Sequence, residues 1–189
     1  MSESKRYRTI VADPPWHYGR FGVGRIPQGT EHDGRATPMP YPMMSVPEIA
    51  ALPVESLAEA DAHLYLWTTQ RYLPEAFSVV EAWGFRYSAT LVWVKTPMPT
   101  MIGGTFRPST EFILFARRGS LAPLRREITQ WWNWPRQRGH SVKPDAMLDM
   151  VESVSPGPYV ELFARRARFG WDYAGNESLG TVDLEGLAS

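Results

Sequence analysis

The chain contains, close to its start, the stretch Thr9-Ile10-Val11-Ala12-Asp13-Pro14-Pro15-Trp16, on which the expected fold depends. Its first four residues have the apolar, β-branched character of a buried strand. The two prolines end that strand, because proline has no backbone N–H for a sheet ladder and holds the preceding residue extended. Asp13 and Trp16 are therefore expected at the carboxyl edge of a sheet, where open α/β folds bind their ligands. This turn is the predicted active site.

The composition predicts one globular domain that comprises residues 1–189. Hydrophobic residues make up 43% of the chain and charged residues 21%, which disfavours disorder. No apolar run approaches the roughly 20 residues that a transmembrane helix needs, so no membrane partner is expected. The first residues lack the apolar segment of a secretory signal, and we therefore expect a cytoplasmic protein.

The numbers of cysteines and histidines limit the kinds of catalytic and metal sites that the chain can form. The chain has no cysteine, which rules out a thiol nucleophile and cysteine-ligated metals. Its histidines, at positions 17, 32, 63 and 140, do not stand at the spacing of metal ligands. We therefore predict no metal site.

Helical and strand patterns alternate along the chain. Strands are predicted at 62–67, 87–94, 111–116 and 159–163, and helices at 45–52, 74–83 and 144–154. Ser45 and Glu48 have the spacing of a capping box, and Gly84 suits a helix C-terminus. The alternation predicts an α/β fold with a largely parallel sheet. Segments 17–44 and 117–140 are predicted to be mobile loops, and residues 1–6 and about 178–189 loosely ordered ends.

One basic segment stands out in a chain whose 20 basic and 20 acidic residues balance. From Arg117 to Lys143 there are seven Lys or Arg residues against a single acid, Glu127, interleaved with Trp131, Trp132 and Trp134. This composition is typical of a surface that binds a nucleic-acid strand and stacks its bases. It also suits tryptophans that cover the core or form a subunit interface. Both interpretations stay open at this point.

The Asp-Pro-Pro-Trp turn suits the alkylation of an exocyclic amine. Asp13 would accept one N–H of the amine and the carbonyl of Pro14 the other, which stabilises the positive charge that develops on nitrogen. The rigid Pro14-Pro15 backbone would need little reorganisation during the reaction. Trp16 would offer a flat face to the base, a contact worth roughly 1–3 kcal/mol in known stacking platforms. The base would have to leave its helix to enter such a pocket. The alternative is that the motif merely ends a strand.

An ordered series of further motifs accompanies this turn, and with it the chain resembles the N6-adenosine methyltransferase family, in particular its prokaryotic and phage branch. The series runs from about residue 8 to 177 and includes Leu64-Tyr-Leu-Trp67, Trp83-Gly-Phe85, Val92-Trp-Val-Lys95-Thr96, Glu111, Ser141-Val-Lys143-Pro-Asp145, Ser155-Pro-Gly157, Glu161-Leu-Phe-Ala-Arg165 and Gly175-Asn176. It departs from the eukaryotic mRNA-modifying enzyme at Ala167, Arg168 and Glu177.

The resemblance implies a Rossmann-like, S-adenosylmethionine-dependent methyltransferase fold in permuted order. The catalytic strand would come first and the cofactor strand last, with Ile10–Asp13 and Tyr159–Phe163 as central neighbours. The implied cofactor is S-adenosyl-L-methionine. By resemblance, Lys143 would reach the carboxylate of its methionine part, and Arg165 and Asn176 would bind its ribose and adenine. Asp13 and Glu177 would lie beside it.

The resemblance also implies the acceptor, the N6 amine of adenine in nucleic acid, by direct methyl transfer. Tyr41 is similar to a loop tyrosine that lines the acceptor pocket. Lys95 and Glu111, which stand in two of the matching motifs, are assigned to substrate binding. Arg136 and Arg138 in the basic segment join them as contacts to nucleic acid.

Several alternatives remain open on the sequence. The acceptor could be cytosine N4 or a protein glutamine, because related enzymes use a similar turn. A catalytically silent partner subunit or a pure nucleic-acid-binding module would need neither an intact Asp13 and Trp16 nor Lys143. DNA is somewhat favoured over RNA because the chain is compact and similar to prokaryotic members. A homodimer or a partner subunit is compatible with the Arg- and Trp-rich segment.

Overall fold

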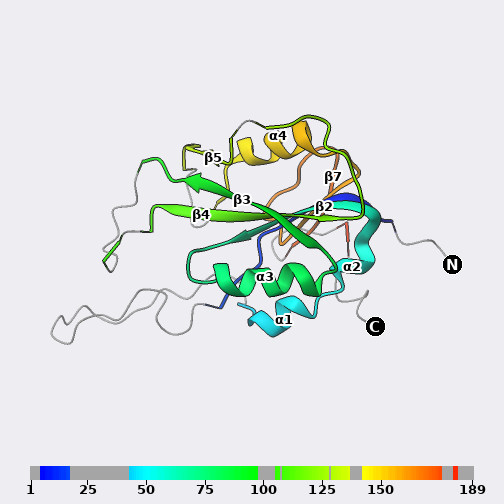
Figure 1. The fold of residues 1–189 in the computed structure, drawn as a ribbon, viewed down its shortest axis with the longest axis horizontal. Helices are drawn as coiled ribbons and strands as arrows, with labels where there is room; N and C mark the ends of the chain where they lie inside the picture. Colours follow the sequence, from blue (N-terminus) through cyan, green and yellow to red (C-terminus); the bar gives the residue numbers. More distant parts are fainter. Residues whose placement is uncertain are drawn as a thin grey trace.

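The structure is a computed structural model that describes residues 5–17, 43–97, 105–106, 108–127, 129–136, 142–175 and 181–182. Most of the predicted loop 17–44 lies outside these residues, as do Tyr41, Arg138, Asn176 and Glu177. The elements in chain order are β1 (Tyr7–Ala12), α1 (Val46–Ala50), α2 (Val54–Leu57), β2 (Ala58–Thr68), α3 (Leu73–Ala82), β3 (Arg86–Val94), β4 (Thr110–Arg118), β5 (Trp131–Trp132), α4 (Asp145–Val154), β6 (Tyr159–Leu162) and β7 (Trp171–Ala174) (Figure 1).

The strands form one sheet in the order β5-β3-β4-β2-β1-β6-β7. β1 runs parallel to β2 and β6, and β7 and β5 pair in parallel with β6 and β3. β4 is antiparallel to both of its neighbours. The predicted α/β architecture, a mostly parallel sheet flanked by helices, is therefore confirmed. So is the central pairing of β1 with β6, in which Ile10 lies opposite Val160 and Ala12 opposite Leu162.

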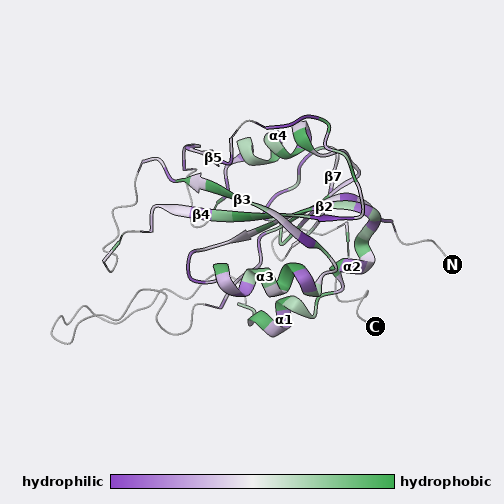
Figure 2. Ribbon diagram, viewed as in Figure 1, coloured by the Kyte–Doolittle hydropathy of each residue, from purple (hydrophilic) through white to green (hydrophobic). Residues whose placement is uncertain are grey.

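Helices cover both faces of this sheet. α1 and α3 lie on one face and α4 on the other (Figure 1), and Figure 2 shows hydrophobic residues along all three. Successive residues of β1 point to opposite faces. Ile10 and Ala12 join the core with α1 and α3, whereas Val11 packs with α4. β1 leads to β2 through α1 and α2, while α4 on the opposite face leads into β6. The carboxyl ends of β1 and β6 therefore border the crevice in which such sheets bind ligands.

The local signals in the sequence correspond to observed contacts. In the capping box before α1, the backbone N–H of Ser45 donates to Glu48 Oε2 at 2.6 Å, and the Ser45 hydroxyl accepts from the backbone N–H of Glu48 at 3.4 Å. Gly84 follows α3 with φ of 76°, a left-handed conformation that glycine adopts without steric cost.

Three predictions about the elements were wrong. Tyr159–Leu162 is not the last strand, because β7 follows it. Arg117 and Arg118 belong to β4, and Trp131 and Trp132 form β5, although all four fall in a segment predicted to be a loop. The cause is the same for the two short strands. Four or two residues are too few to show a local periodicity, so these strands are recognised only by their pairing with β6 and β3.

The buried His63 makes the stability of this fold depend on pH. Its Nδ1 lies 2.8 Å from the Ser155 hydroxyl and its Nε2 3.1 Å from the Leu121 carbonyl oxygen. Burial lowers the pKa of His63 below its ordinary value of 6.5, an effect that the Leu121 carbonyl partly opposes. Below pH 6.5 the unfolded chain thus binds a proton that the folded chain does not, and stability falls as the pH falls.

We therefore expect the free energy of unfolding of wild type to fall more steeply than that of a His63→Gln variant between pH 7.5 and pH 5.5. Denaturant unfolding at both pH values measures this difference. Equal pH dependence in wild type and His63→Gln would contradict the expectation.

Candidate active site

Four charged side chains of alternating sign meet at the carboxyl edge of the sheet. Lys143 Nζ lies 2.7 Å from Asp13 Oδ2 and 3.2 Å from Glu111 Oε2, and Lys95 Nζ lies 2.7 Å from Glu111 Oε1. All four were predicted as site residues, and they lie far apart in the sequence. We call Asp13, Lys143, Glu111 and Lys95 the charged quartet. Their side chains are 12–20% exposed, so solvent screens these pairs less than surface ion pairs.

The sheet topology explains why the quartet forms. Asp13 follows the end of β1, and Lys95 follows the end of β3. Glu111 stands at the start of β4, which lies at the same edge because β4 runs in the opposite direction. Lys143 comes from the segment that leads into α4, and its ammonium lies 5.0 Å from the ring centroid of Trp67, near the end of β2. The quartet thus draws on three strands and the segment before one helix, and a fourth strand, β2, supplies the neighbouring Trp67.

Burial and pairing set the protonation of the quartet. Burial raises the pKa of the Asp13 carboxyl, and the positive charges of Lys143 and Arg165 only partly offset this. Burial alone would lower the pKa of Lys143, but Asp13 and Glu111 together hold it above its usual range. Burial likewise acts to raise the pKa of Glu111, and Lys143 and Lys95 reverse that effect to leave it lowered. The cationic Lys143 therefore favours the ionised form of both carboxyl groups, and its effect prevails over burial at Glu111 but not at Asp13.

The Asp-Pro-Pro-Trp turn is held by backbone hydrogen bonds. The N–H of Asp13 donates to the Leu162 carbonyl at 3.4 Å, which joins the turn to the end of β6. The Pro14 carbonyl accepts the N–H of Trp16 at 2.9 Å, and the Pro15 carbonyl accepts the N–H of Met44 at 2.8 Å. Since a carbonyl oxygen has two lone pairs, that of Pro14 keeps one for an amine N–H.

The expected open face of Trp16 is not present. The indole ring is only 4% exposed. It stacks on Tyr72 with the ring centroids 5.2 Å apart, and its Nε1 donates to the Trp67 carbonyl at 3.1 Å. The expectation that Trp16 offers a flat face to a base is therefore corrected. Trp16 anchors the turn in the core, a role that depends on Tyr72, which no local pattern places beside it.

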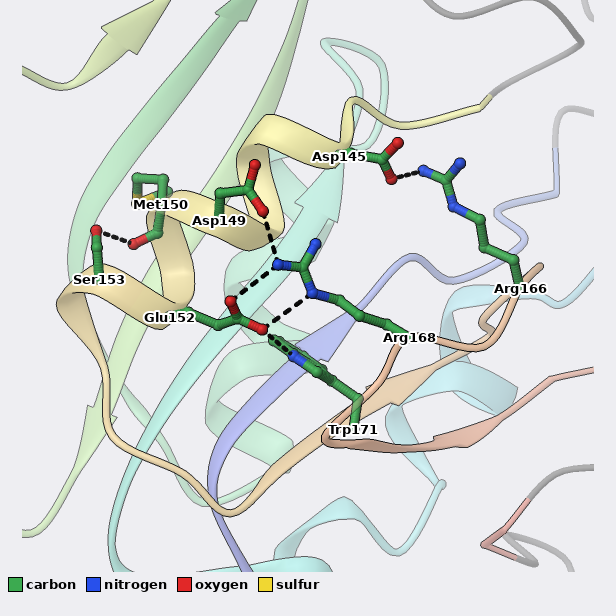
Figure 3. A network of polar contacts seen from close by, with 8 residues as sticks. All are labelled: Asp145, Asp149, Met150, Glu152, Ser153, Arg166, Arg168 and Trp171. Atoms are coloured by element: carbon green, nitrogen blue, oxygen red, sulfur yellow. Dashed lines mark hydrogen bonds and ion pairs between the residues drawn. The ribbon is translucent and has the colours of Figure 1, made fainter.

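The loop between β6 and β7 carries Arg165 and is fastened to α4. Arg168 donates to Asp149 at 2.6 Å and to both oxygens of Glu152 at 2.8 and 2.9 Å (Figure 3). Trp171 Nε1 donates to Glu152 at 2.6 Å, and Arg166 pairs with Asp145. These contacts were not predicted from the sequence, where Arg168 stood out only as a departure from the eukaryotic enzyme. They hold Arg165 close enough to Asp13 to act on its pKa.

Glu161 is a site residue that the sequence reasoning missed. It stands in β6 next to β1, and it is partly buried. Burial, with the negative charge of Asp13 as a second cause, raises the pKa of Glu161 to about 7. Its signal in the sequence was its place in a strand predicted to lie beside Asp13. Perturbed carboxyl groups of this kind gather at functional sites.

The remaining predicted residues are only partly described. Arg136 is exposed, and its N–H donates to the Thr96 carbonyl at 2.8 Å, next to Lys95 of the quartet. Arg136, in the basic segment, therefore lies beside the charged quartet. In the described ranges, no three His, Cys, Asp or Glu side chains are grouped so that they could hold a metal ion. Among the helices that the structure describes, none has the length and hydrophobicity needed to cross a membrane.

Comparison with known proteins identifies the family. The MT-A70 family model matches residues 7–177. The chain belongs to the MT-A70 family. This confirms the resemblance, and methyltransferases of the MT-A70 family use S-adenosylmethionine.

Individual relatives differ in how much of their length they share with this chain. It is 32% identical to the type II methyltransferase M.MunI of a Mycoplasma species, over 92% of this chain and 78% of that protein. It is 32% identical to a putative N(6)-adenosine-methyltransferase MT-A70-like protein of Medicago truncatula and 25% identical to the N(6)-adenosine-methyltransferase catalytic subunit METTL3 of Homo sapiens. These matches cover 96% and 91% of this chain but only 28% of either relative.

The edge of this MT-A70 chain fits the cofactor of its family. The cofactor bears a carboxylate, an ammonium and a sulfonium. Lys143 offers a cation for the first, and Asp13 and Glu111 offer carboxylates near the positive groups. The backbones of Gly175 and Ala164 also approach each other closely. A Cβ added to Gly175 would lie only 2.0 Å from the Ala164 carbonyl oxygen. Only glycine permits this, at the end of β7 beside the loop that carries Arg165.

The pairing of Lys143 with both Asp13 and Glu111 can be tested without any ligand. Replacing Lys143 by Met should raise the pKa of both Asp13 and Glu111, because it removes the cation that favours their ionised forms. Replacing Lys95 by Met should raise the pKa of Glu111 more than that of Asp13. Carbon NMR titration of the carboxyl groups measures both values. An unchanged Asp13 titration in Lys143→Met would contradict the observed pairing.

Proposed function

We propose that this MT-A70 chain transfers a methyl group from S-adenosylmethionine to the exocyclic N6 amine of adenine in nucleic acid, with DNA favoured over RNA. The observation that carries the proposal is the placement of Asp13. Its carboxylate and the carbonyl of Pro14 belong to one rigid turn, at the carboxyl ends of the paired strands β1 and β6, beside the Lys143 cation. Two acceptors for one amine, next to a cation suited to the cofactor's carboxylate, are what amine methylation requires.

Asp13 acts in this mechanism as a hydrogen-bond acceptor. The amine nitrogen of adenine is a poor nucleophile because its lone pair is delocalised into the ring. One N–H would donate to Asp13 and the other to the Pro14 carbonyl, which stabilises the charge that develops on nitrogen during attack. The ionised form of Asp13 is needed, and Lys143 and Arg165 favour it against the effect of burial. Asp13 is thus neither a nucleophile nor a metal ligand.

The cofactor contributes an activated methyl group, so no covalent intermediate with the protein is needed. Lys143 would bind the carboxylate of the cofactor's methionine part. Arg165, whose neighbours Arg166 and Arg168 pair with α4, would bind the cofactor's ribose. Lys95 and Glu111, at the other end of the quartet from Asp13, would border the acceptor. The protein's main contribution is alignment of amine and methyl group, which can supply several kcal/mol. The proton lost by the alkylated nitrogen leaves readily without a histidine or cysteine base.

The basic segment supports binding of nucleic acid next to this pocket. Trp132 and Trp134 stack on each other with centroids 5.0 Å apart and pack against the core under α4. Trp131, by contrast, is 59% exposed. Trp132 and Trp134 thus cover the core, which was one of the two interpretations of this segment. Trp131 has exposed surface on which a base could stack. With Arg136 beside Thr96, it forms a basic and aromatic edge near Lys95.

The preference for DNA over RNA is supported by how much of each relative's length this chain matches. The chain spans most of the length of the bacterial type II methyltransferase and about a quarter of the N(6)-adenosine-methyltransferases. Labelled-methyl transfer onto DNA and RNA oligonucleotides of matched sequence tests this. Nuclease digestion to nucleosides then identifies the modified base. Label on N6-methyldeoxyadenosine supports the proposal, whereas label on cytosine or on protein would overturn it.

Asp13→Ala should reduce methyl transfer by at least about 10²- to 10³-fold, because one of two acceptors for the amine is lost. Binding of S-adenosylhomocysteine, measured by calorimetry, should remain detectable in this variant, since Lys143 and Arg165 are intact. Asp61→Ala, altered near the start of β2 far from the edge, serves as the control with normal turnover. Full activity of Asp13→Ala would exclude the mechanism.

Joint reversal of the charges at Arg136 and Arg138 should weaken oligonucleotide binding and flatten its dependence on salt. Each phosphate contact that is lost lowers the slope of log K against log salt by about 0.7–0.9. Fluorescence anisotropy at several salt concentrations measures the slope. Arg86→Glu, at the start of β3 and so at the opposite end of the sheet, is the matched control. An unchanged slope in the double variant would show that these residues do not contact nucleic acid.

A further inference from the structure

A cavity that includes no residue of the charged quartet lies on the α4 face of the sheet. Its volume is about 300 Å³, and its walls come from β2, β3, β4, β5, α4 and the segment after β4. Arg117, which lines it, stands six residues after Glu111 along β4. At about 3.3 Å per strand residue, the two Cα atoms are some 20 Å apart. The Arg117 end of the cavity is therefore far from the proposed active site.

Most of the wall is apolar and partly aromatic. Leu91 and Phe115 project from the sheet, Met150 and Val154 from α4, and Trp132 from β5. Such a surface suits a flat hydrocarbon body, and the volume lies at the lower end of the range for small-molecule sites. An occupant of one or two rings would fill it.

Two neutral polar side chains of the cavity wall, those of His63 and Tyr65, already have partners. His63 and Tyr65 line it, and both contact the Ser155 hydroxyl, at 2.8 and 2.7 Å. The second ring nitrogen of His63 faces the Leu121 carbonyl at 3.1 Å. A chain of hydrogen bonds from Tyr65 through Ser155 and His63 to Leu121 satisfies all of these groups, with His63 neutral. They set no demand on a ligand.

The cations of the cavity are not balanced in the same way. Arg117 donates from Nη2 to the Leu121 carbonyl at 2.7 Å, and the structure records no carboxylate partner for it within the described ranges. Its Nε is the buried side-chain nitrogen that, in the described part of the chain, has no hydrogen-bond partner. Arg125 pairs with Glu127, and Arg126 is a third basic residue of the lining. Arg125 and Arg126 are exposed, so solvent can screen their charges, whereas Arg117 is partly buried with one buried N–H unpaired. Buried charged groups are usually paired, so Arg117 is the group of this lining that calls for an anion.

We propose that this cavity is a binding site for a small aromatic anion. The ring body would lie between Phe115, Trp132 and Met150, and the carboxylate or phosphate would pair with Arg117, with Arg126 contributing at the rim. A planar guanidinium binds either anion through two hydrogen bonds. The inference does not depend on the methyl-transfer proposal, because it uses no residue of the charged quartet or of the Asp-Pro-Pro-Trp turn.

Calorimetry with 2-naphthoate on the full chain tests the site. We expect binding with a dissociation constant between about 10 μM and 1 mM, as is usual for a ligand of this size. The neutral 2-naphthamide has the same rings without the charge and should bind at least tenfold more weakly. 2-Naphthyl phosphate is titrated in the same way. Whichever of 2-naphthoate and 2-naphthyl phosphate binds more tightly shows whether the site prefers a carboxylate or a phosphate.

Two variants locate the binding. Arg117→Met keeps the apolar stem and removes the cation, and it should weaken binding of 2-naphthoate about ten- to a hundredfold. Arg118→Met is the matched control, since the next side chain on β4 points to the other face and pairs with Glu55. Ala89→Leu fills the cavity from β3 without altering a charge and should also abolish binding, which keeps the test sound if Arg117→Met does not fold.

Other results would overturn the proposal. These are no binding of either anion at 1 mM, equal affinity for the amide, or equal effects of Arg117→Met and Arg118→Met. Competition of 2-naphthoate with S-adenosylhomocysteine in the same titration would also overturn it, because the probe would then occupy the edge of the sheet.

Discussion

The contact between Lys143 and Asp13, 2.7 Å long, is the interaction on which the site depends. Taken alone, each group would be unfavourable at this place, because burial opposes ionisation of both. Together with Glu111 and Lys95 they form an alternating row in which every charge faces an opposite one. The row joins the ends of separate strands, so it also holds the carboxyl edge in one arrangement. A site built in this way is charged and largely buried before any ligand arrives, which favours catalysis by preorganised groups.

Two kinds of support keep this edge in place. Under the Asp-Pro-Pro-Trp turn, Trp16 is anchored in the core by Tyr72 and the Trp67 carbonyl. Beside it, Arg168 and Trp171 fasten the loop after β6 to acidic residues of α4 (Figure 3). Both supports act through residues outside the charged quartet and hold the backbone segments that flank it. The departure of residue 168 from the eukaryotic enzyme thus has a structural explanation, since an arginine here spans two carboxylates of one helix.

The two faces of the sheet serve different purposes. The face under α1 and α3 holds a densely buried apolar core, with the rings of Trp16 and Trp83 inside it. The face under α4 carries the buried polar chain of His63, Tyr65 and Ser155 and, toward the start of β2, the arginine-lined cavity. α4 contributes residues to that cavity and follows directly after the segment that bears Lys143. The same helix therefore borders both sites of the molecule.

The sequence by itself determined the features that rest on local chemistry. Two prolines after an apolar run fixed the end of β1 and the display of Asp13, and the Ser45–Glu48 spacing fixed the start of α1. The ordered motifs predicted the family, its cofactor and the four members of the quartet as separate site residues. Only the tertiary structure decided how these residues meet, that Trp16 is buried, that β5 and β7 join the sheet and that Arg117 lacks a counter-charge. The physical reason is that strand pairing, burial and charge balance depend on partners distant in the chain, whereas caps, turns and periodicity depend on neighbours within a few residues.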